Sequence, residues 1–228
     1  MGIAANALVI VLGGLLGSKL QKSITEESER TLGICIVIVS LVGFFENIYR
    51  IQGQTITSES LMIVLLAFLV GSKLGEALHL EERLSNLGKD AQNQRHGVLD
   101  AFLYFGVGGM QICGPILLAT QGDNSQLLLK SAIDIPFAIV FGAAYGKTAA
   151  LAAIPVALVQ VLIAGAAYLF RGLFTEQMIT ELCAVGYIIL FFSGFNLIAG
   201  GKHRISNLNM LPGVLLIMLL QGGKEWLL

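Results

Sequence analysis

Long apolar segments, separated by short polar stretches, make up most of this chain. A helix of about 20 mostly apolar residues is long enough to cross the hydrocarbon core of a bilayer. Segments of roughly this kind occupy residues 2–20, 31–49, 61–78, 97–120, 126–146, 148–171, 177–200 and 208–221. The last is the shortest, and it suits either a full crossing or a half-span. The pattern predicts an all-α, polytopic transmembrane helix bundle of seven or eight spans, in a single domain over residues 1–228.

The composition excludes several classes of protein. Hydrophobic residues make up 55% of the chain and charged residues 13%, against roughly 25% charged residues in a soluble domain. This excludes a soluble enzyme, a disordered chain and a secreted disulfide scaffold. Because 14 basic residues face 15 acidic ones, there is no basic excess for binding nucleic acid. Cys35, Cys113 and Cys183 lie in apolar runs without metal-ligand spacing, so we expect no transition-metal site.

The basic residues predict an orientation in the membrane. Ten of the 14 basic residues fall in the loops after the first, third, fifth and seventh segments. Because positive loops stay on the cytoplasmic side, we expect both termini outside. Residues 79–96 then form a cytoplasmic loop. In it Leu80, Leu84 and Leu87 recur at helical spacing, which fits either a short amphipathic helix or a solvated connector.

One carboxylate lies deep within an apolar segment, whereas the other acidic residues fall near segment ends or in loops. Asp134 is about eight residues into its segment, or about 12 Å along a helix. A carboxylate at membrane depth costs on the order of 2.5–3.5 kcal/mol and usually has a function. Pro136 leaves the backbone carbonyl of Ala132 without its helical donor, which would add a second cation ligand. Alternatively, Lys130 pairs with Asp134 at i,i+4 as a neutral structural link.

Amide side chains in four different apolar segments form a second set of groups whose burial in lipid is energetically unfavourable. Lipid cannot satisfy their hydrogen bonds, so they must meet one another, water or a solute. Taken singly, each is typical of a hydrogen bond between helices, but together with Asp134 they indicate a shared polar interior. The candidates for ion binding or transport are therefore Asp134, Ser131, Lys130, Asn6, Gln111, Gln160 and Asn196.

Prolines and glycines mark candidate helix breaks. We expect the fourth segment to be interrupted around residues 106–115, with simple kinking as the alternative. Another break, at residues 145–148, separates the fifth segment from the sixth. The candidate breaks or hinges are Pro115, Pro136, Pro155, Pro212, Gly108 and Gly109.

Small residues four apart let helix backbones approach closely. Such pairs are Gly13 with Gly17, Gly71 with Gly75, and Gly142 with Gly146. Most should serve contacts within the chain, although one could support a homo-oligomer. Separately, Gly43-Phe44 in the second segment is echoed by Gly194-Phe195 in the seventh. These segments should run in opposite directions, which fits an inverted repeat of segments one to three by six to eight.

Several stretches, taken in order, resemble the domain-of-unknown-function 554 (DUF554, YqgA-like) family of integral membrane proteins. The resemblance covers nearly the whole chain, and its strongest block joins Lys130-Ser131 and Asp134 to Gly146, Pro155-Val156 and Gln160. Ile135-Pro136 departs from the small residues that often follow the Asp in such proteins. The other matching stretches are Asn6-Ala7-Leu8, Gly13-Gly14, Gly71 with Gly75-Glu76, Leu80-Glu81, Leu87-Gly88, Gly106-Val107-Gly108, Gly122-Asp123, Asn196-Leu197 and Asn209-Met210-Leu211-Pro212.

The resemblance implies a multi-pass protein of a prokaryotic cytoplasmic membrane. Members of this family have been described loosely as sodium channels or pumps and linked to biofilm behaviour, without a settled substrate. No enzyme signature occurs in the sequence, so we expect no enzymatic activity and no cofactor other than Na⁺.

Three functional hypotheses follow. The leading one is a channel or gradient-driven transporter for a small cation, Na⁺ or H⁺, through Asp134 and the buried amides. The alternatives are a transporter of a small polar organic solute, and a membrane scaffold or sensor acting through residues 79–96.

Overall fold

The computed structural model describes residues 1–20, 26–51, 58–86, 101–102, 105–106, 109–199 and 205–227. Throughout these ranges the regular elements are helices, which confirms the all-α fold class. The α-helices are α1 (Gly2–Gly17), α2 (Glu26–Ile51), α3 (Ser58–Ala77), α4 (Leu80–Asn86), α6 (Gly109–Gln121), α7 (Ser125–Tyr145), α8 (Ala153–Leu169), α9 (Glu176–Ile198) and α10 (Leu211–Leu227). Short 3₁₀ helices are η1 (Gly146–Ala152), η2 (Arg171–Leu173) and η3 (Leu208–Met210).

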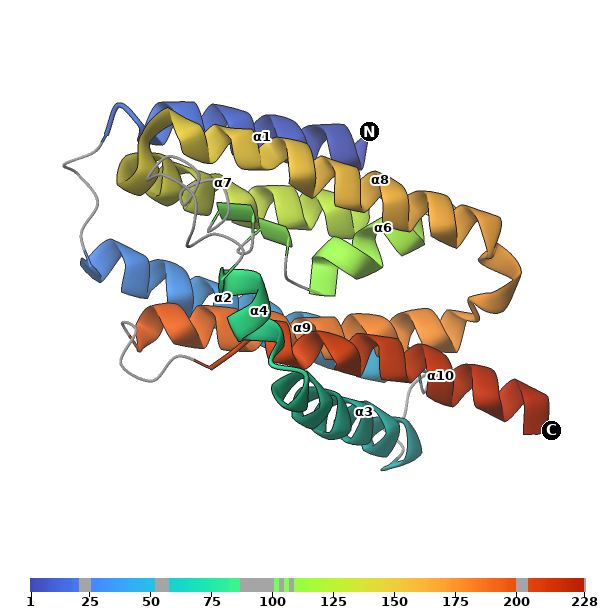
Figure 1. The fold of residues 1–228 in the computed structure, drawn as a ribbon. Helices are drawn as coiled ribbons and strands as arrows, with labels where there is room; N and C mark the ends of the chain where they lie inside the picture. The colour runs from blue at the N-terminus through green and yellow to red at the C-terminus, as the bar shows by residue number, and fades with distance from the viewer. Residues whose placement is uncertain are drawn as a thin grey trace.

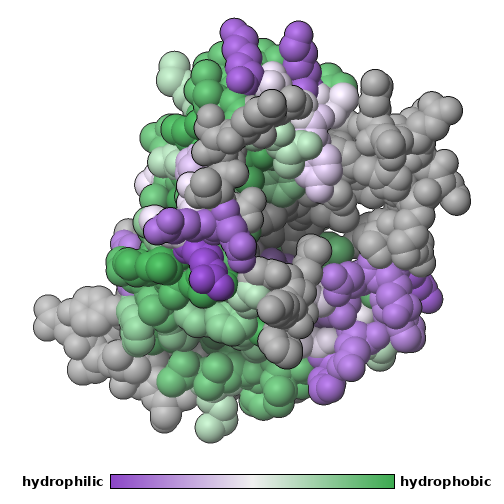
Figure 2. Space-filling model, turned by 90° about the vertical axis from the view of Figure 1, so that its left-hand side faces the viewer, coloured by the Kyte–Doolittle hydropathy of each residue, from purple (hydrophilic) through white to green (hydrophobic). Residues whose placement is uncertain are grey.

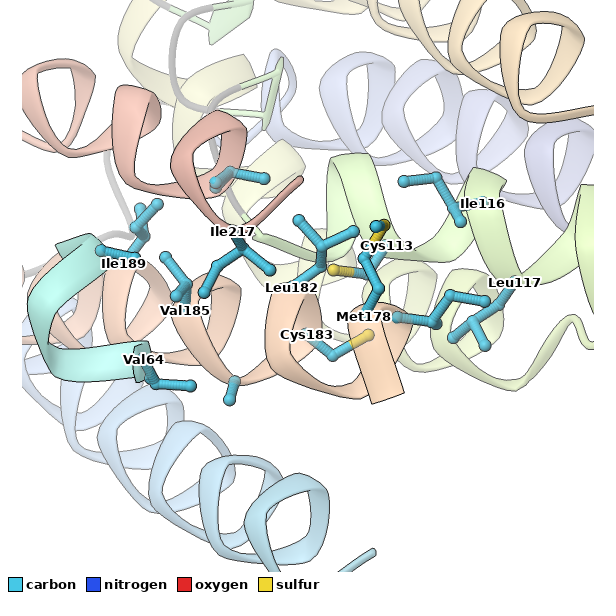
Figure 3. Packing of buried hydrophobic residues seen from close by; sticks show 14 of the residues in the cluster. Val64, Cys113, Ile116, Leu117, Met178, Leu182, Cys183, Val185, Ile189 and Ile217 are labelled. Carbon is cyan, nitrogen blue, oxygen red and sulfur yellow. The ribbon is translucent and has the colours of Figure 1, made fainter. Parts of the chain in front are cut away.

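The helices form two packed groups (Figure 1). In one group α1 lies against α7 and α8, and in the other α9 lies against α2 and α10, while α3 packs on α10. Helix α6 contacts both α8 and α9 and so joins the groups. There are two apolar clusters, one around α9 and one around α1 and α7, and the second also includes Ile36 of α2. Figure 3 shows the core around α9, where Leu182, Val185, Ile189 and Ile217 are buried together with the neighbouring thiols of Cys113 and Cys183.

Glycines let the paired helices touch backbone to backbone. A Cβ atom on Gly17 would overlap the carbonyl oxygen of Ile139, and one on Gly142 would overlap that of Gly14. The α1–α7 contact therefore depends on residues without side chains, as small-residue pairs do in membrane helices. Gly13 also faces α7. On α3, Gly71 faces Gly213 of α10 and Gly75 faces Asn209 of η3.

The same contacts give the relative directions of the helices. Gly2 of α1 lies against Leu127 and Gly17 lies against Ile139, so α1 and α7 run parallel. By contrast, Gly14 lies against Ala150, and Asn6 bonds Gln160, so α1 and α8 run antiparallel. Helices α7 and α8 therefore run antiparallel, as the sequence predicted for the fifth and sixth segments. The chain turns after Tyr145 through Gly146, whose φ of 71° is a conformation that suits glycine.

The prolines act differently from the sequence prediction. Helix α6 continues through Pro115 and α7 continues through Pro136, so neither helix is broken there. A membrane helix tolerates proline because neighbouring groups satisfy the freed backbone. Pro155 and Pro212 lie in the first turn of α8 and α10, where a missing N–H has no cost. Gly109 is the first residue of α6, and Gly108 lies outside the described residues.

Three described segments are long and apolar enough to cross a membrane, at residues 26–48, 125–169 and 176–198. The second of these contains α7, η1 and α8. Two further apolar helices, at residues 2–17 and 208–221, are shorter. The number of spans therefore stays a prediction.

Large apolar side chains cover the flanks of the molecule. Leu162 of α8 is 63% exposed and Leu219 of α10 is 70% exposed. An apolar surface of this extent is typical of contact with lipid. Figure 2 shows one end of the molecule, where hydrophilic side chains appear among hydrophobic ones.

The stretch after α3 forms the short helix α4, as one of the two sequence interpretations predicted. The backbone N–H of Glu81 donates to Asn209 Oδ1 at 3.2 Å, which ties α4 to η3. Residues 87–96 of the predicted cytoplasmic loop lie outside the described residues.

Candidate functional site

A buried ion pair on α7 forms the charged part of the candidate site. Lys130 Nζ lies 2.7 Å from Asp134 Oδ2, and the two side chains are only 8% and 7% exposed. The residues are one helical turn apart and therefore share a face of the helix. The structure thus contains the Lys130–Asp134 pair at i,i+4, which the sequence analysis gave as the alternative to a carboxylate without a charged partner.

Three amides continue from this pair across α1, α8 and α6. Asn6 Nδ2 donates to Asp134 Oδ2 at 2.6 Å. Gln160 Nε2 donates to Asn6 Oδ1 at 3.0 Å and to Gln111 Oε1 at 2.9 Å. Gln111 Nε2 in turn donates to the backbone carbonyl of Val156 at 3.0 Å. Asn6 and Gln160 are completely buried, so the chain of bonds runs through the interior of the helix group.

The Asp134 carboxylate determines which end of each amide faces which partner in this series of hydrogen bonds. An ionised carboxylate only accepts hydrogen bonds, so Asn6 must present its NH₂ group to Asp134 and its oxygen to Gln160. Gln160 must then present its NH₂ group to Asn6. Its own oxygen, Gln160 Oε1, is left buried without a hydrogen-bond partner.

This arrangement favours a ligand that carries positive charge or donates a hydrogen bond. The NH₂ groups of Asn6, Gln160 and Gln111 each point at a protein oxygen, whereas Gln160 Oε1 is an acceptor with nothing bound. Leaving a buried polar atom unsatisfied costs roughly 1–3 kcal/mol. A donor or cation at Gln160 Oε1 would relieve that cost, whereas an anion would meet only oxygens there. Within the described residues, no three His, Cys, Asp or Glu side chains come together as metal ligands.

Two of the predicted site residues do not reach the cluster. Asn196 is near the end of α9, and its amide bonds both the N–H and the C=O of Ile205 at 2.8 Å. The prediction that it shares the polar interior was therefore wrong, because the amide instead satisfies backbone groups beyond the helix end. Ser131 is buried beside the ion pair, but its hydroxyl donates to the carbonyl of Leu127 within α7.

The structure contains a second buried carboxylate that the sequence does not predict, since only Asp134 is expected to be deeply buried. Glu181 of α9 is completely buried. Its Oε1 accepts from Gln177 Nε2 at 3.0 Å and its Oε2 contacts Gln221 Nε2 of α10 at 2.5 Å. Glu181 lies only five residues after the start of α9, a position near a segment end where the sequence gives no sign of deep burial. The one usable signal was Gln177 at i−4, on the same helix face.

Comparison with known proteins places this chain in a family. The model of the family described as "Protein of unknown function (DUF554)" matches residues 1–221. The chain belongs to the DUF554 family. It is 26% identical over 224 residues to the "Uncharacterized membrane protein YdfK" of Bacillus subtilis (strain 168), covering 94% of this chain and 93% of that protein.

A second relative is the "Uncharacterized protein YqgA" of Escherichia coli (strain K12). It is 28% identical over 237 residues, which cover 98% of this chain and 97% of that protein. No solved structure matches the chain. The resemblance found in the sequence is therefore confirmed, and the chain is a helical membrane protein of this family.

Proposed function

We propose that this DUF554 protein transports a small monovalent cation, Na⁺ or H⁺, across the membrane, with Asp134 as the charged ligand. The observation that carries the proposal is the series of hydrogen bonds from Asp134 through Asn6 to Gln160, whose own Oε1 is a buried acceptor without a partner. Ionisable groups at membrane depth mark ion or proton pathways more often than they serve packing.

Lys130 has a specific part in this proposal. Its ammonium already neutralises Asp134 at 2.7 Å, so an arriving cation must replace Lys130 at the carboxylate. The protein then has two states, one with Lys130 on Asp134 and one with the cation there. A ligand shifts such an equilibrium by its difference in affinity for the two states. This exchange suits a gradient-driven transporter better than an open channel, because an ion pair closes the site when no cation is bound.

The proposal extends to orientation, with both termini on the outer face of a prokaryotic cytoplasmic membrane. The parallel run of α1 with α7, and the antiparallel run of α1 with α8, agree with the order of crossings assumed by the positive-inside argument. Reporter fusions at the two ends and after Lys147 would test it. Reporters active on the same side at all three places would contradict the orientation.

Flux in proteoliposomes tests the transport proposal. Wild-type protein should carry radioactive Na⁺, or protons followed with a trapped pH dye, down an imposed gradient. The double variant Lys130→Gln/Asp134→Asn removes both charges together and so leaves no unpaired buried ion. We expect it to fold and to lose the flux. Glu76→Gln makes the same chemical change in an exposed ion pair with Lys73, and it should keep the flux.

Flux through the double variant at the wild-type rate would overturn the role of Asp134. A deletion experiment in cells tests the alternative that the protein is a scaffold or sensor. Under that alternative, deletion of residues 81–95 would abolish the effect of the protein on the cells that produce it, whereas the double variant would keep that effect. Flux of a labelled polar solute that depends on Na⁺ would instead favour the solute transporter.

A further inference from the structure

The cation exchange proposed above leaves the ammonium of Lys130 without its carboxylate. Lys130 is buried, so its charge does not simply pass into water when a cation takes its place on Asp134. A buried ammonium without an acceptor is energetically very unfavourable. If Asp134 binds a cation, the protein must therefore offer Lys130 another acceptor within reach of its side chain.

Gln126 of α7 is placed to be that acceptor. It lies four residues before Lys130, and Asp134 lies four residues after it. Side chains four apart are neighbours on one helix face, so Lys130 stands between two oxygen-bearing side chains, each about one turn of 5.4 Å away. The ammonium can pass from one to the other by rotation about its own side-chain bonds, while the α7 backbone stays in place.

The direction of helical side chains favours the Gln126 side. The Cα–Cβ bonds of a helix tilt towards its N-terminus, so Lys130 leans towards Gln126 and reaches Asp134 only against this tilt. Ion pairs show the same preference, because an acidic residue four positions before a lysine binds it better than one four positions after. The Lys130–Asp134 pair has the less favourable order. Charge therefore holds the ammonium at Asp134, and a cation that neutralises the carboxylate removes that hold.

A hydroxyl group from the other helix group fixes the amide of Gln126. The buried side chain of Tyr187, on α9, donates its hydroxyl to Gln126 Oε1 at 2.7 Å. An amide oxygen has two lone pairs, so Gln126 Oε1 can accept from Lys130 while it keeps its bond to Tyr187. The phenolic oxygen of Tyr187 can also accept a hydrogen bond. The two side chains together thus present two oxygens to an arriving ammonium.

Other polar groups beside the ion pair suit the ammonium less well. Asn6 turns its NH₂ group towards the carboxylate, and an NH₂ group cannot accept a hydrogen bond from Lys130. The oxygen of Asn6 faces Gln160, which lies further along the series of hydrogen bonds, on α8. Ser131 donates its hydroxyl back to the carbonyl of Leu127. Gln126 is therefore the acceptor on the same helix face that points towards the start of α7.

We propose that Gln126 and Tyr187 form a second binding position for the Lys130 ammonium and thereby set how tightly a cation binds at Asp134. This role rests on the cation exchange proposed above, and it makes Gln126 and Tyr187 positioning residues that do not touch the transported ion. A better acceptor at the second position draws Lys130 away and strengthens cation binding, because it stabilises the state that binds the cation. Since Tyr187 belongs to α9, the move also carries the lysine charge to the contact between the two helix groups.

Binding of radioactive Na⁺ to the whole protein in detergent tests this role. Gln126→Glu places a carboxylate at the second position, in the favourable order for a pair with Lys130, and should lower the Kd for Na⁺ on the order of tenfold. Tyr187→Phe removes one of the two oxygens and should raise the Kd by about two- to tenfold. Gln121→Glu is the matched control, because it makes the same chemical change in an exposed residue at the end of α6, and it should leave the Kd unchanged.

A Lys130→Gln background separates an effect through the lysine from the general attraction of an added negative charge. In that background Gln126→Glu should leave the Kd at the value that Lys130→Gln alone gives. An equal gain in both backgrounds would overturn the proposal, and so would an unchanged Kd in Gln126→Glu. If Lys130→Gln proves unstable, the opposite effects of Gln126→Glu and Tyr187→Phe still test the role, because a merely structural contact would not move the Kd in both directions.

Fluorine NMR reads the position of the ammonium without a transport measurement. With 3-fluorotyrosine in place of Tyr187, addition of Na⁺ or acid to otherwise wild-type protein should shift the fluorine resonance as Lys130 arrives. Lys130→Gln should abolish this shift. In Gln126→Glu the resonance should already differ from the wild type without Na⁺, by an amount that depends on the presence of Lys130.

The two proposals fail in different ways. Wild-type protein that binds and carries Na⁺, but whose fluorine resonance shows no shift that depends on Lys130, would refute the second position and leave transport standing. Protein that carries no cation, but whose Gln126→Glu resonance depends on Lys130, would refute transport and keep the second position of the ammonium.

Discussion

Removing one charge of the Lys130–Asp134 pair should destabilise the protein more than removing both. Each side chain is less than one tenth exposed, and the two charges are 2.7 Å apart. Breaking such a buried pair at one side leaves an uncompensated charge and costs about 3–5 kcal/mol. We therefore expect losses of this size for Asp134→Asn and for Lys130→Gln. A variant with Asp134→Asn alone is thus a poor test of transport, since lost flux could reflect lost folding.

The double variant Lys130→Gln/Asp134→Asn should lie closer to the wild type than either single variant. It has no unpaired charge, and replacing a buried ion pair by neutral groups is often nearly neutral. The amide that replaces the Asp134 carboxylate would still face Asn6, so part of the 2.6 Å contact can be kept in neutral form. A double-mutant cycle over the wild type, the two single variants and the double variant should give a large interaction energy between Lys130 and Asp134, as expected for residues in contact.

Titration with sodium dodecyl sulfate, followed by circular dichroism, would measure the free energy of unfolding of all four proteins. Glu76→Gln serves as the control, because its pair with Lys73 is exposed and should contribute little. The reasoning would be refuted by a double variant whose loss equals the sum of the two single losses. It would also fail if either single variant were as stable as the wild type.

Three further changes can be followed by the same titration. Gly17→Ala should destabilise the α1–α7 contact by about 1–3 kcal/mol through overpacking, because its Cβ would overlap the Ile139 carbonyl. The control Gly165→Ala has open space around it and should be neutral or slightly stabilising. Equal losses of stability in the two variants would contradict the close contact. Gln160→Leu should cost about 1–3 kcal/mol for each buried oxygen that loses its donor, and a silent variant would remove Gln160 from the chain of bonds. Tyr187→Phe should cost about 0.5–1.5 kcal/mol, because its hydroxyl donates to Gln126 across α7 and α9; no change would mean that solvent or lipid replaces the bond.

The sequence was sufficient to identify most residues of the polar cluster, but not to predict which of them contact one another. Asp134, Asn6, Gln111 and Gln160 each stand out because lipid cannot satisfy a polar group. Asn196 met the same criterion and proved to bond backbone beyond its own helix. The burial of Glu181 cannot be predicted from the sequence, because its position near a helix start resembles that of an exposed residue. Burial at a helix end depends on which neighbour covers it, and here α10 supplies Gln221 from 40 residues away.

The sequence by itself determined the helical class, the family, the turn at Gly146 and the presence of a costly carboxylate at Asp134. These follow from local properties, namely the length of apolar runs, the conformational freedom of glycine and the cost of a charge in lipid. Only the tertiary structure decided which helices touch, that Lys130 neutralises Asp134, and that Asn6 meets Gln160 across 154 residues. Such contacts depend on how whole helices pack, and a polar group in a membrane takes whichever partner that packing brings within reach.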